Sequence, residues 1–169
     1  MEFDLDAVDT RSLSEQGVWL TLKTLDGEPL KGYRGRPVRL LMHGPDSEKF
    51  RRALRVATAK RMAPEAIDAE RKADPVELAE QAERDSIEML VTCIKGWENV
   101  PSKDKAEVRF TREAARALIT AYPIIREQAE QFYAFRRNFV LASSSGSSPT
   151  AEASSPGDEP QVAEAPPAP

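Results

Sequence analysis

The chain has few of the residues on which metal sites and redox chemistry depend. Among its 169 residues there is one cysteine, Cys93, and one histidine, His43. A single cysteine excludes an intramolecular disulfide and fits a reducing compartment. Structural metal sites usually need several His or Cys ligands, and these two residues lie far apart in the sequence. We therefore expect no metal and no cofactor, and we expect Cys93 to be a small buried hydrophobe.

The motifs of common enzymes are lacking as well. The segment Gly32-Tyr33-Arg34-Gly35 has no Lys-Ser/Thr ending, which a phosphate-binding loop would require. The carboxylates are numerous but scattered over helical surfaces, so no two of them are singled out as an acid and a base. We predict no catalytic residues and a protein that is not an enzyme, with a carboxylate-based active site as the disfavoured alternative.

Long apolar runs are also missing. No stretch of about 18 apolar residues could cross a bilayer. The first residues, Met1-Glu2-Phe3-Asp4-Leu5-Asp6, are acidic and lack the apolar core of a secretion signal. These two features predict a soluble, cytoplasmic protein that does not contact a membrane.

Lys and Arg are absent from one part of the chain, the segment 143–169. This segment is rich in Ser, Pro and Ala and carries four of the 28 acidic residues. The other 24 acidic residues are matched by 24 Lys and Arg, so residues 1–142 have no net charge and the acidity lies in the tail. With so few large apolar residues, segment 143–169 is predicted to be a disordered acidic tail.

The start of the chain combines a polar segment with two β-prone stretches. Residues 1–16 are mostly polar and acidic and are interpreted as a flexible arm. The stretches 18–22 and 37–42 are rich in β-branched and large apolar residues, and the Asp26-Gly27 turn signal lies between them. Together they predict a hairpin or small antiparallel sheet, which must pack on helices to be stable.

The rest of the body, up to residue 142, has the pattern of helices. One helix is predicted from Asp46 or Ser47 to about Met62, and a second from Pro75 to Lys95, ended by Gly96. Two more begin after Thr111 and at Pro123. Residues 62–73 extend the second helix or form a shorter one. The predicted fold class is mainly α (α+β), a helical domain over 17–142 with a small N-terminal antiparallel β element.

Six positive residues on the helix 49–61 make nucleic acid a candidate partner. Lys49, Arg51, Arg52, Arg55, Lys60 and Arg61 could neutralise phosphates, as in a small nucleic-acid-associated regulatory protein. The electrically balanced body argues against this function, because nucleic-acid binders normally carry net positive charge. We expect no nucleic-acid partner and keep the regulator as the alternative.

The segment 96–139 concentrates aromatic residues without reactive groups, which is typical of protein binding. The residues predicted to contact a partner protein are Trp97, Phe110, Tyr133, Arg136 and Phe139. Core packing is the alternative for the aromatic residues, and the sequence leaves the choice open.

The same landmarks resemble one family. Asp46-Ser47 is followed by Phe50-Arg51, and then by Gly96-Trp97, Phe110-Thr111, Pro123-Ile124 and Arg137-Asn138-Phe139. In this order, over roughly residues 17–141, they look like the tail assembly chaperones of long-tailed bacteriophages and prophages.

The resemblance implies a non-enzymatic role during tail morphogenesis. Such a protein binds the tape measure protein, recruits tail tube subunits and is absent from the mature virion. The implied partners are therefore the tape measure protein and the tail tube protein, and a homo-oligomer is left open.

Overall fold

The computed structural model describes residues 8–102 and 106–140. The fold is mainly helical with a small antiparallel sheet, as predicted. The tail predicted over 143–169 lies outside the described residues. Within them, no helix combines the length and the apolar character needed to cross a membrane.

The sheet has three strands in the order β1-β2-β3, each antiparallel to its neighbour. β1 is Val18–Thr21, β2 is Arg39–Met42 and β3 is Ile94–Glu98. The pairing of β1 with β2 confirms the predicted N-terminal β element. Between these strands the chain forms the short 3₁₀ turn η2, Tyr33–Gly35.

β3 corrects the prediction of a helix continuing to Lys95. Helix α4 is Pro75–Cys93, and from Ile94 the chain pairs with β2, with Leu40 opposite Trp97 and Leu41 opposite Gly96. The pairing buries Ile94 and Trp97 and satisfies the free edge of β2, which outweighs the local preference for a helix ended by glycine. Gly96 and Trp97 are thus strand residues.

Helix starts follow the predicted capping residues. The Ser47 hydroxyl accepts a hydrogen bond from the Phe50 amide at the start of α2, Glu48–Arg61. The Asp74 carboxylate accepts one from the Val76 amide at the start of α4, and Thr111 caps α5, Arg112–Ala121. Local side-chain chemistry therefore sets these boundaries. Pro64–Lys72 forms a separate helix, α3, and Pro123–Ala134 forms α6.

The flexible arm predicted over 1–16 is partly helical. Residues Arg11–Gln16 form α1, and Ser14 on this helix is fully buried. Its carbonyl oxygen accepts a hydrogen bond from the Gly44 amide, so the segment is attached to the body after β2. Residues 1–7 of the predicted arm lie outside the described part of the chain.

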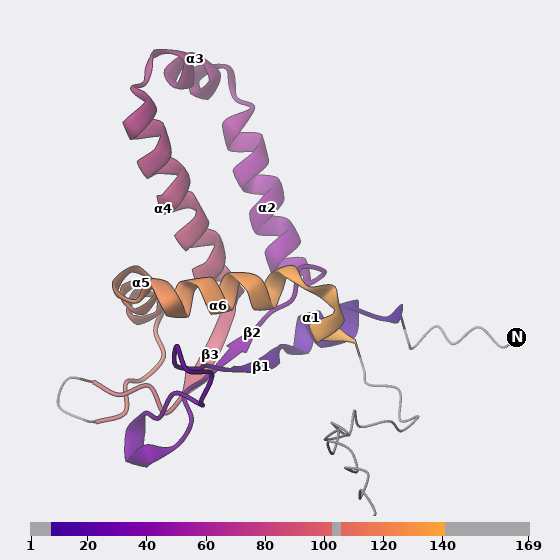
Figure 1. Cartoon of the computed structure of the whole chain (residues 1–169). Coiled ribbons are helices and arrows are strands. Elements are labelled where there is room, and N and C mark those ends of the chain that lie inside the picture. The colour runs from indigo at the N-terminus through magenta and orange to yellow at the C-terminus, as the bar shows by residue number, and fades with distance from the viewer. Residues whose placement is uncertain (1–7, 103–105, 141–169) are drawn as a thin grey trace, which may run out of the picture.

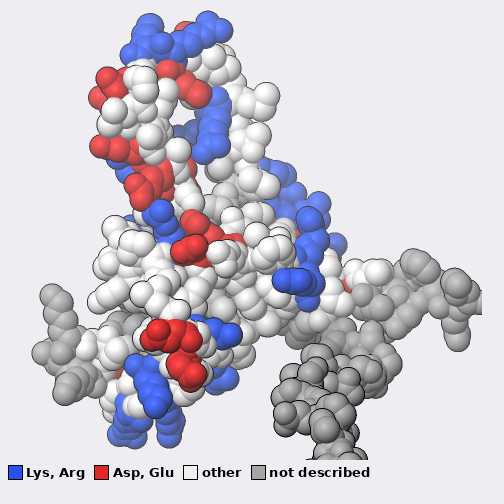
Figure 2. Space-filling view, in the orientation of Figure 1, with Lys and Arg blue, Asp and Glu red and all other residues white. Residues whose placement is uncertain are grey.

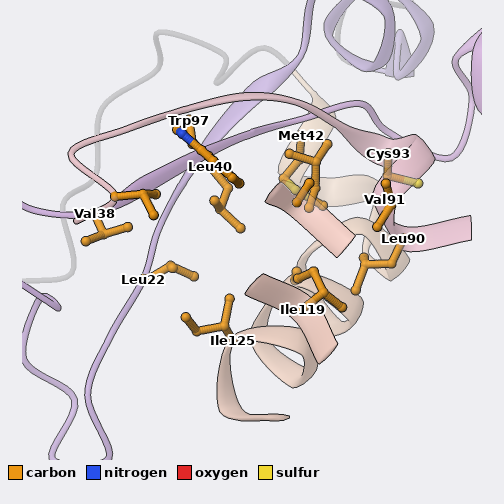
Figure 3. Close-up of a cluster of buried hydrophobic side chains, with 14 of the residues drawn as sticks. Leu22, Val38, Leu40, Met42, Leu90, Val91, Cys93, Trp97, Ile119 and Ile125 are labelled. Atoms are coloured by element: carbon orange, nitrogen blue, oxygen red, sulfur yellow. The ribbon is translucent and has the colours of Figure 1, made fainter. Parts of the chain in front are cut away.

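The core lies between one face of the sheet and the helices at its base. Leu40, Met42 and Trp97 from the sheet meet Leu90 of α4, Ile119 of α5 and Ile125 of α6 (Figure 3). The final 3₁₀ turn η3, Arg136–Phe139, adds the fully buried Phe139. From this core α2, α3 and α4 project together in one direction, while α6 runs across their base (Figure 1).

Candidate protein-binding groove

The projecting part of the molecule has no core of its own. From Glu48 to Ser86, through α2, α3 and the first part of α4, no residue is buried. The buried residues of α4 begin at Ile87. We call the segment Glu48–Ser86 the helical arm. Short helices gain most of their stability from tertiary packing, so a helical segment in which no residue is buried presents surface that a partner would cover.

The composition of the arm explains its exposure. Phe50, Ala53, Leu54 and Ala57 recur at helical spacing along α2, as on the inward face of a helix. Of these four, only Phe50 packs against the core, where its ring centroid lies 5.7 Å from that of Tyr133. Leu54 is 48% exposed, and Ala53 and Ala57 are half-buried. Alanine methyl groups bury little area, so the contacts between α2 and α4 bury less apolar surface than large side chains would.

A groove of about 1460 Å³ runs along the arm. Its apolar surface comes from alanines of all three helices, with Val56, Leu78 and Met89 among them. Val56 is 63% exposed and adds to the apolar surface of the groove. Small side chains at a helix contact allow axes to approach closely, so this lining suits a helical partner.

The two long helices give the groove walls of opposite charge. The α2 wall holds four basic residues against one acidic one, namely Lys49, Arg52, Lys60, Arg61 and Glu48. The α4 wall holds four acidic residues against one basic one, namely Glu77, Glu80, Asp85, Glu88 and Arg84. Figure 2 shows acidic side chains gathered along the α4 side and a hollow between the long helices. The groove therefore offers an apolar floor between a basic and an acidic side.

More ion pairs join the base of α4 to the body than join the two walls of the groove to each other. Glu88 is held by Arg116 and lies 3.5 Å from Arg112, which lowers the pKa of Glu88, chiefly through the hydrogen bond from Arg116. One pair, between Arg61 and Asp85 at 3.2 Å, joins α2 to α4 across the groove. Both side chains are exposed, so this pair contributes little stability and a ligand could displace it at little cost.

Two of the predicted partner contacts, Trp97 and Phe110, belong to the body. Trp97 is 9% exposed and its Nε1–H donates to the Val108 carbonyl oxygen at 2.7 Å. Phe110 is half-buried and meets the Trp97 ring edge-to-face, with centroids 5.1 Å apart. The two rings close one side of the core, so the structure places them together but away from the groove.

The other three lie near the end of α6. Phe139 is fully buried against Phe132, so it is a core residue rather than a surface contact. Tyr133 is half-buried beside Phe50, and burial raises the pKa of its phenol. Arg136 is exposed and pairs with Asp46 at 2.9 Å. Of the five predicted residues, Arg136 alone has an exposed side chain.

His43 and Cys93 occupy structural positions. The His43 ring is buried, with Nδ1 3.2 Å from the Ser14 carbonyl oxygen, and burial lowers its pKa. Cys93 is buried, which raises its pKa to about 12. Within residues 8–102 and 106–140, no group of three or more His, Cys, Asp or Glu side chains could hold a metal.

The basic residues of helix 49–61 do not form one continuous surface. Lys49, Arg52, Lys60 and Arg61 line the groove opposite carboxylates, whereas Arg55 pairs with Glu48 at 2.6 Å. A phosphate backbone entering the groove would meet the acidic α4 wall, which disfavours binding. The arrangement fits an occupant that carries both signs of charge.

The arm was not identified from the sequence as a site, although signals were present. Alanines recur at Ala53 and Ala57 on α2 and at Ala66, Ala69 and Ala73 in and after α3. Basic residues dominate the first of the long helices and acidic residues the second. This pattern indicates small-residue contacts flanked by charge, but only the arrangement of the three helices shows that they face one groove.

Comparison with known proteins adds no relative: no family model, no curated protein and no solved structure matches the chain.

Proposed function

We propose that this protein is a tail assembly chaperone of a long-tailed bacteriophage or prophage. It binds the tape measure protein, recruits tail tube subunits during tail morphogenesis and leaves before the virion is mature. The proposal rests on the ordered landmarks between Asp46 and Phe139 that resemble this family, and on a helical arm whose surface suits a protein ligand.

The single observation that carries the proposal is the uncovered helical arm. No residue of the helical arm is buried, which leaves apolar side chains that a helical client would cover. A tape measure protein is expected to be a long, largely helical chain with apolar seams. Alanines in the groove can contact such a seam, while the charged walls keep the complex soluble.

The body has a different part in this function. Its core is filled by large side chains, including Trp97 and Phe139, so it gives the arm a packed base. The ion pairs from Glu88 to α5 and from Glu83 to Arg126 of α6 fix the base of the arm on the body. The client is therefore bound by an element that projects from a stable support.

Co-expression tests the proposal directly. The gene should lie between a tail tube gene and a very long tape measure gene, and the full chain should keep that tape measure protein soluble. Ala57→Trp fills the groove and should reduce the soluble client severalfold. Ala117→Trp, on the exposed face of α5, is the matched control and should behave as the wild type.

Two results would count against the proposal. One is a tape measure protein that is equally soluble with and without this chain. The other is a gene neighbourhood without tail genes. If the Ala57→Trp and Ala117→Trp variants both keep the tape measure protein as soluble as the wild type does, the groove is not the client site. The chaperone function would then have to reside elsewhere on the molecule.

A further inference from the structure

Resting on the proposed function, we infer that the groove fixes the direction of the bound helix. The occupant is a single amphipathic client helix with an apolar seam, an acidic flank that lies along α2 and a basic flank that lies along α4. Reversing the helix in the groove would exchange its flanks and bring like charges together on both sides. The two opposed walls therefore select one direction.

The size of the groove suits one helix. A helix with side chains is roughly 10 Å across and rises 1.5 Å per residue, so about 1460 Å³ accommodates about 12 residues, or three turns. Ala66 and Ala69 of α3 line the groove between its two walls. A second copy would bring a whole helical arm, which is wider than one helix, so a single client segment fits better.

Several charged side chains of the two walls form no ion pair with another described residue. Among the described residues, no ion pair engages Lys49, Arg52 or Lys60 on the α2 wall. On the α4 wall Glu77 also has no ion-pair partner within the described ranges, and Glu80 is 3.4 Å from Arg84 of its own helix. Asp85 and Glu88 of the same wall pair with Arg61 and Arg116, so the carboxylate of the α4 wall without an ion pair to a described residue is Glu77, near the start of the helix.

Walls of opposite charge favour one direction of the bound helix, whereas walls of one sign would not. With two basic walls, an acidic helix would bind equally well in either direction. With one basic and one acidic wall, the attractive direction and the repulsive direction differ at each turn of the client. Complementary charge then sets orientation, while the apolar floor contributes affinity that does not depend on direction.

Two designed peptides test the inference. Each is a 15-residue helix with a seam of Ala and Leu. Viewed from the N-terminus with the seam facing down, the first peptide has Glu on its left flank and Lys on its right flank. The second has the same composition with the two flanks exchanged. A fluorescence donor is placed on a Met62→Cys variant of the full chain, since Met62 is 71% exposed near the tip of the arm. The native Cys93 is buried with a pKa of about 12 and should not be labelled.

An acceptor on either end of each peptide reports its direction by energy transfer. The expected result is that both peptides bind and that the end lying near Met62 differs between them. A Lys49→Glu, Arg52→Glu, Lys60→Glu variant makes both walls acidic and should remove the preference, with about tenfold weaker binding. The control, Arg51→Glu, Arg71→Glu, Lys72→Glu, changes charge equally outside the groove and should leave direction intact.

The outcomes separate this inference from the function on which it rests. Binding without a preferred direction, or a preference that survives in the 49/52/60 variant, overturns the inference and leaves the chaperone proposal standing. Failure of both peptides to bind, while the tape measure protein is still kept soluble, overturns the groove as a helix site. A stable dimer that is lost in Ala57→Trp would place a second copy in the groove and overturn the inference as well.

Discussion

Trp97 shows how one side chain can serve the fold where the sequence suggested a partner contact. Its indole is nearly buried, its Nε1–H donates to the Val108 carbonyl oxygen, and its ring edge meets Phe110. These contacts join β3 to the segment before α5. An aromatic residue at this point of the sequence is compatible with either role, so its burial had to be observed.

Replacing Trp97 tests this role. Trp97→Phe removes the donor to Val108 and leaves space in the core, so the free energy of unfolding should fall by about 2 kcal/mol. Urea denaturation followed by circular dichroism measures the change. Trp19→Phe is the matched control, because Trp19 is 39% exposed and contacts Arg39 on the uncovered face of the sheet. Equal losses for the two variants would contradict the core assignment.

At the scale of elements, the ends of the described chain meet beside the start of α2. Asp46 accepts hydrogen bonds from Thr10, just before α1, and from Arg136 of η3. The bond from Arg136 is the main reason that the pKa of Asp46 is lowered. Three segments that are distant in sequence are thus joined through one carboxylate.

This junction predicts a pH dependence. Because the pKa of Asp46 is lowered in the folded state, the stability it contributes is present above its ordinary pKa of about 3.9 and is lost as pH falls through the lowered value. Arg136→Gln should lower the urea midpoint at pH 7 and reduce the dependence on pH between about pH 5 and pH 3. Asp46 is the group whose titration changes.

Arg137→Gln is the control for this measurement. Arg137 lies over the Phe135 ring and forms no ion pair with any described residue. The Arg137→Gln substitution should therefore leave the pH dependence of the free energy of unfolding unchanged. If the Arg136→Gln and Arg137→Gln profiles coincide, the Asp46 pair does not contribute to acid sensitivity.

Across the whole molecule, stability is unevenly distributed. The sheet, α5, α6 and the end of α4 share one core, whereas the helical arm Glu48–Ser86 has no buried residue. Elements with few buried contacts open with small free energies. The arm should therefore open more readily than the body and become ordered when a client fills its groove.

Hydrogen exchange followed by mass spectrometry tests this expectation. Amides of α2, α3 and the first half of α4 should exchange at least about tenfold faster than those of α5 and β2. Saturation with a groove-binding helix should slow exchange in the arm and leave α6 unchanged. Protection of the free arm equal to that of α5 would contradict the uneven distribution of stability.

Local chemistry in the sequence was enough to determine where α2, α4 and α5 begin. Ser47, Asp74 and Thr111 each accept a hydrogen bond from an amide two or three residues ahead, and such contacts depend on neighbours in the chain alone. Apolar periodicity and composition likewise determined the mainly helical fold with a small N-terminal β element. Tertiary structure decided the features that need distant partners: β3 forms because β2 offers an unpaired edge, and Phe139 is buried because Phe132 and Gly44 lie beside it. The groove belongs to the same group, since charges on α2 and α4 become two walls only when the turn through α3 brings these helices face to face.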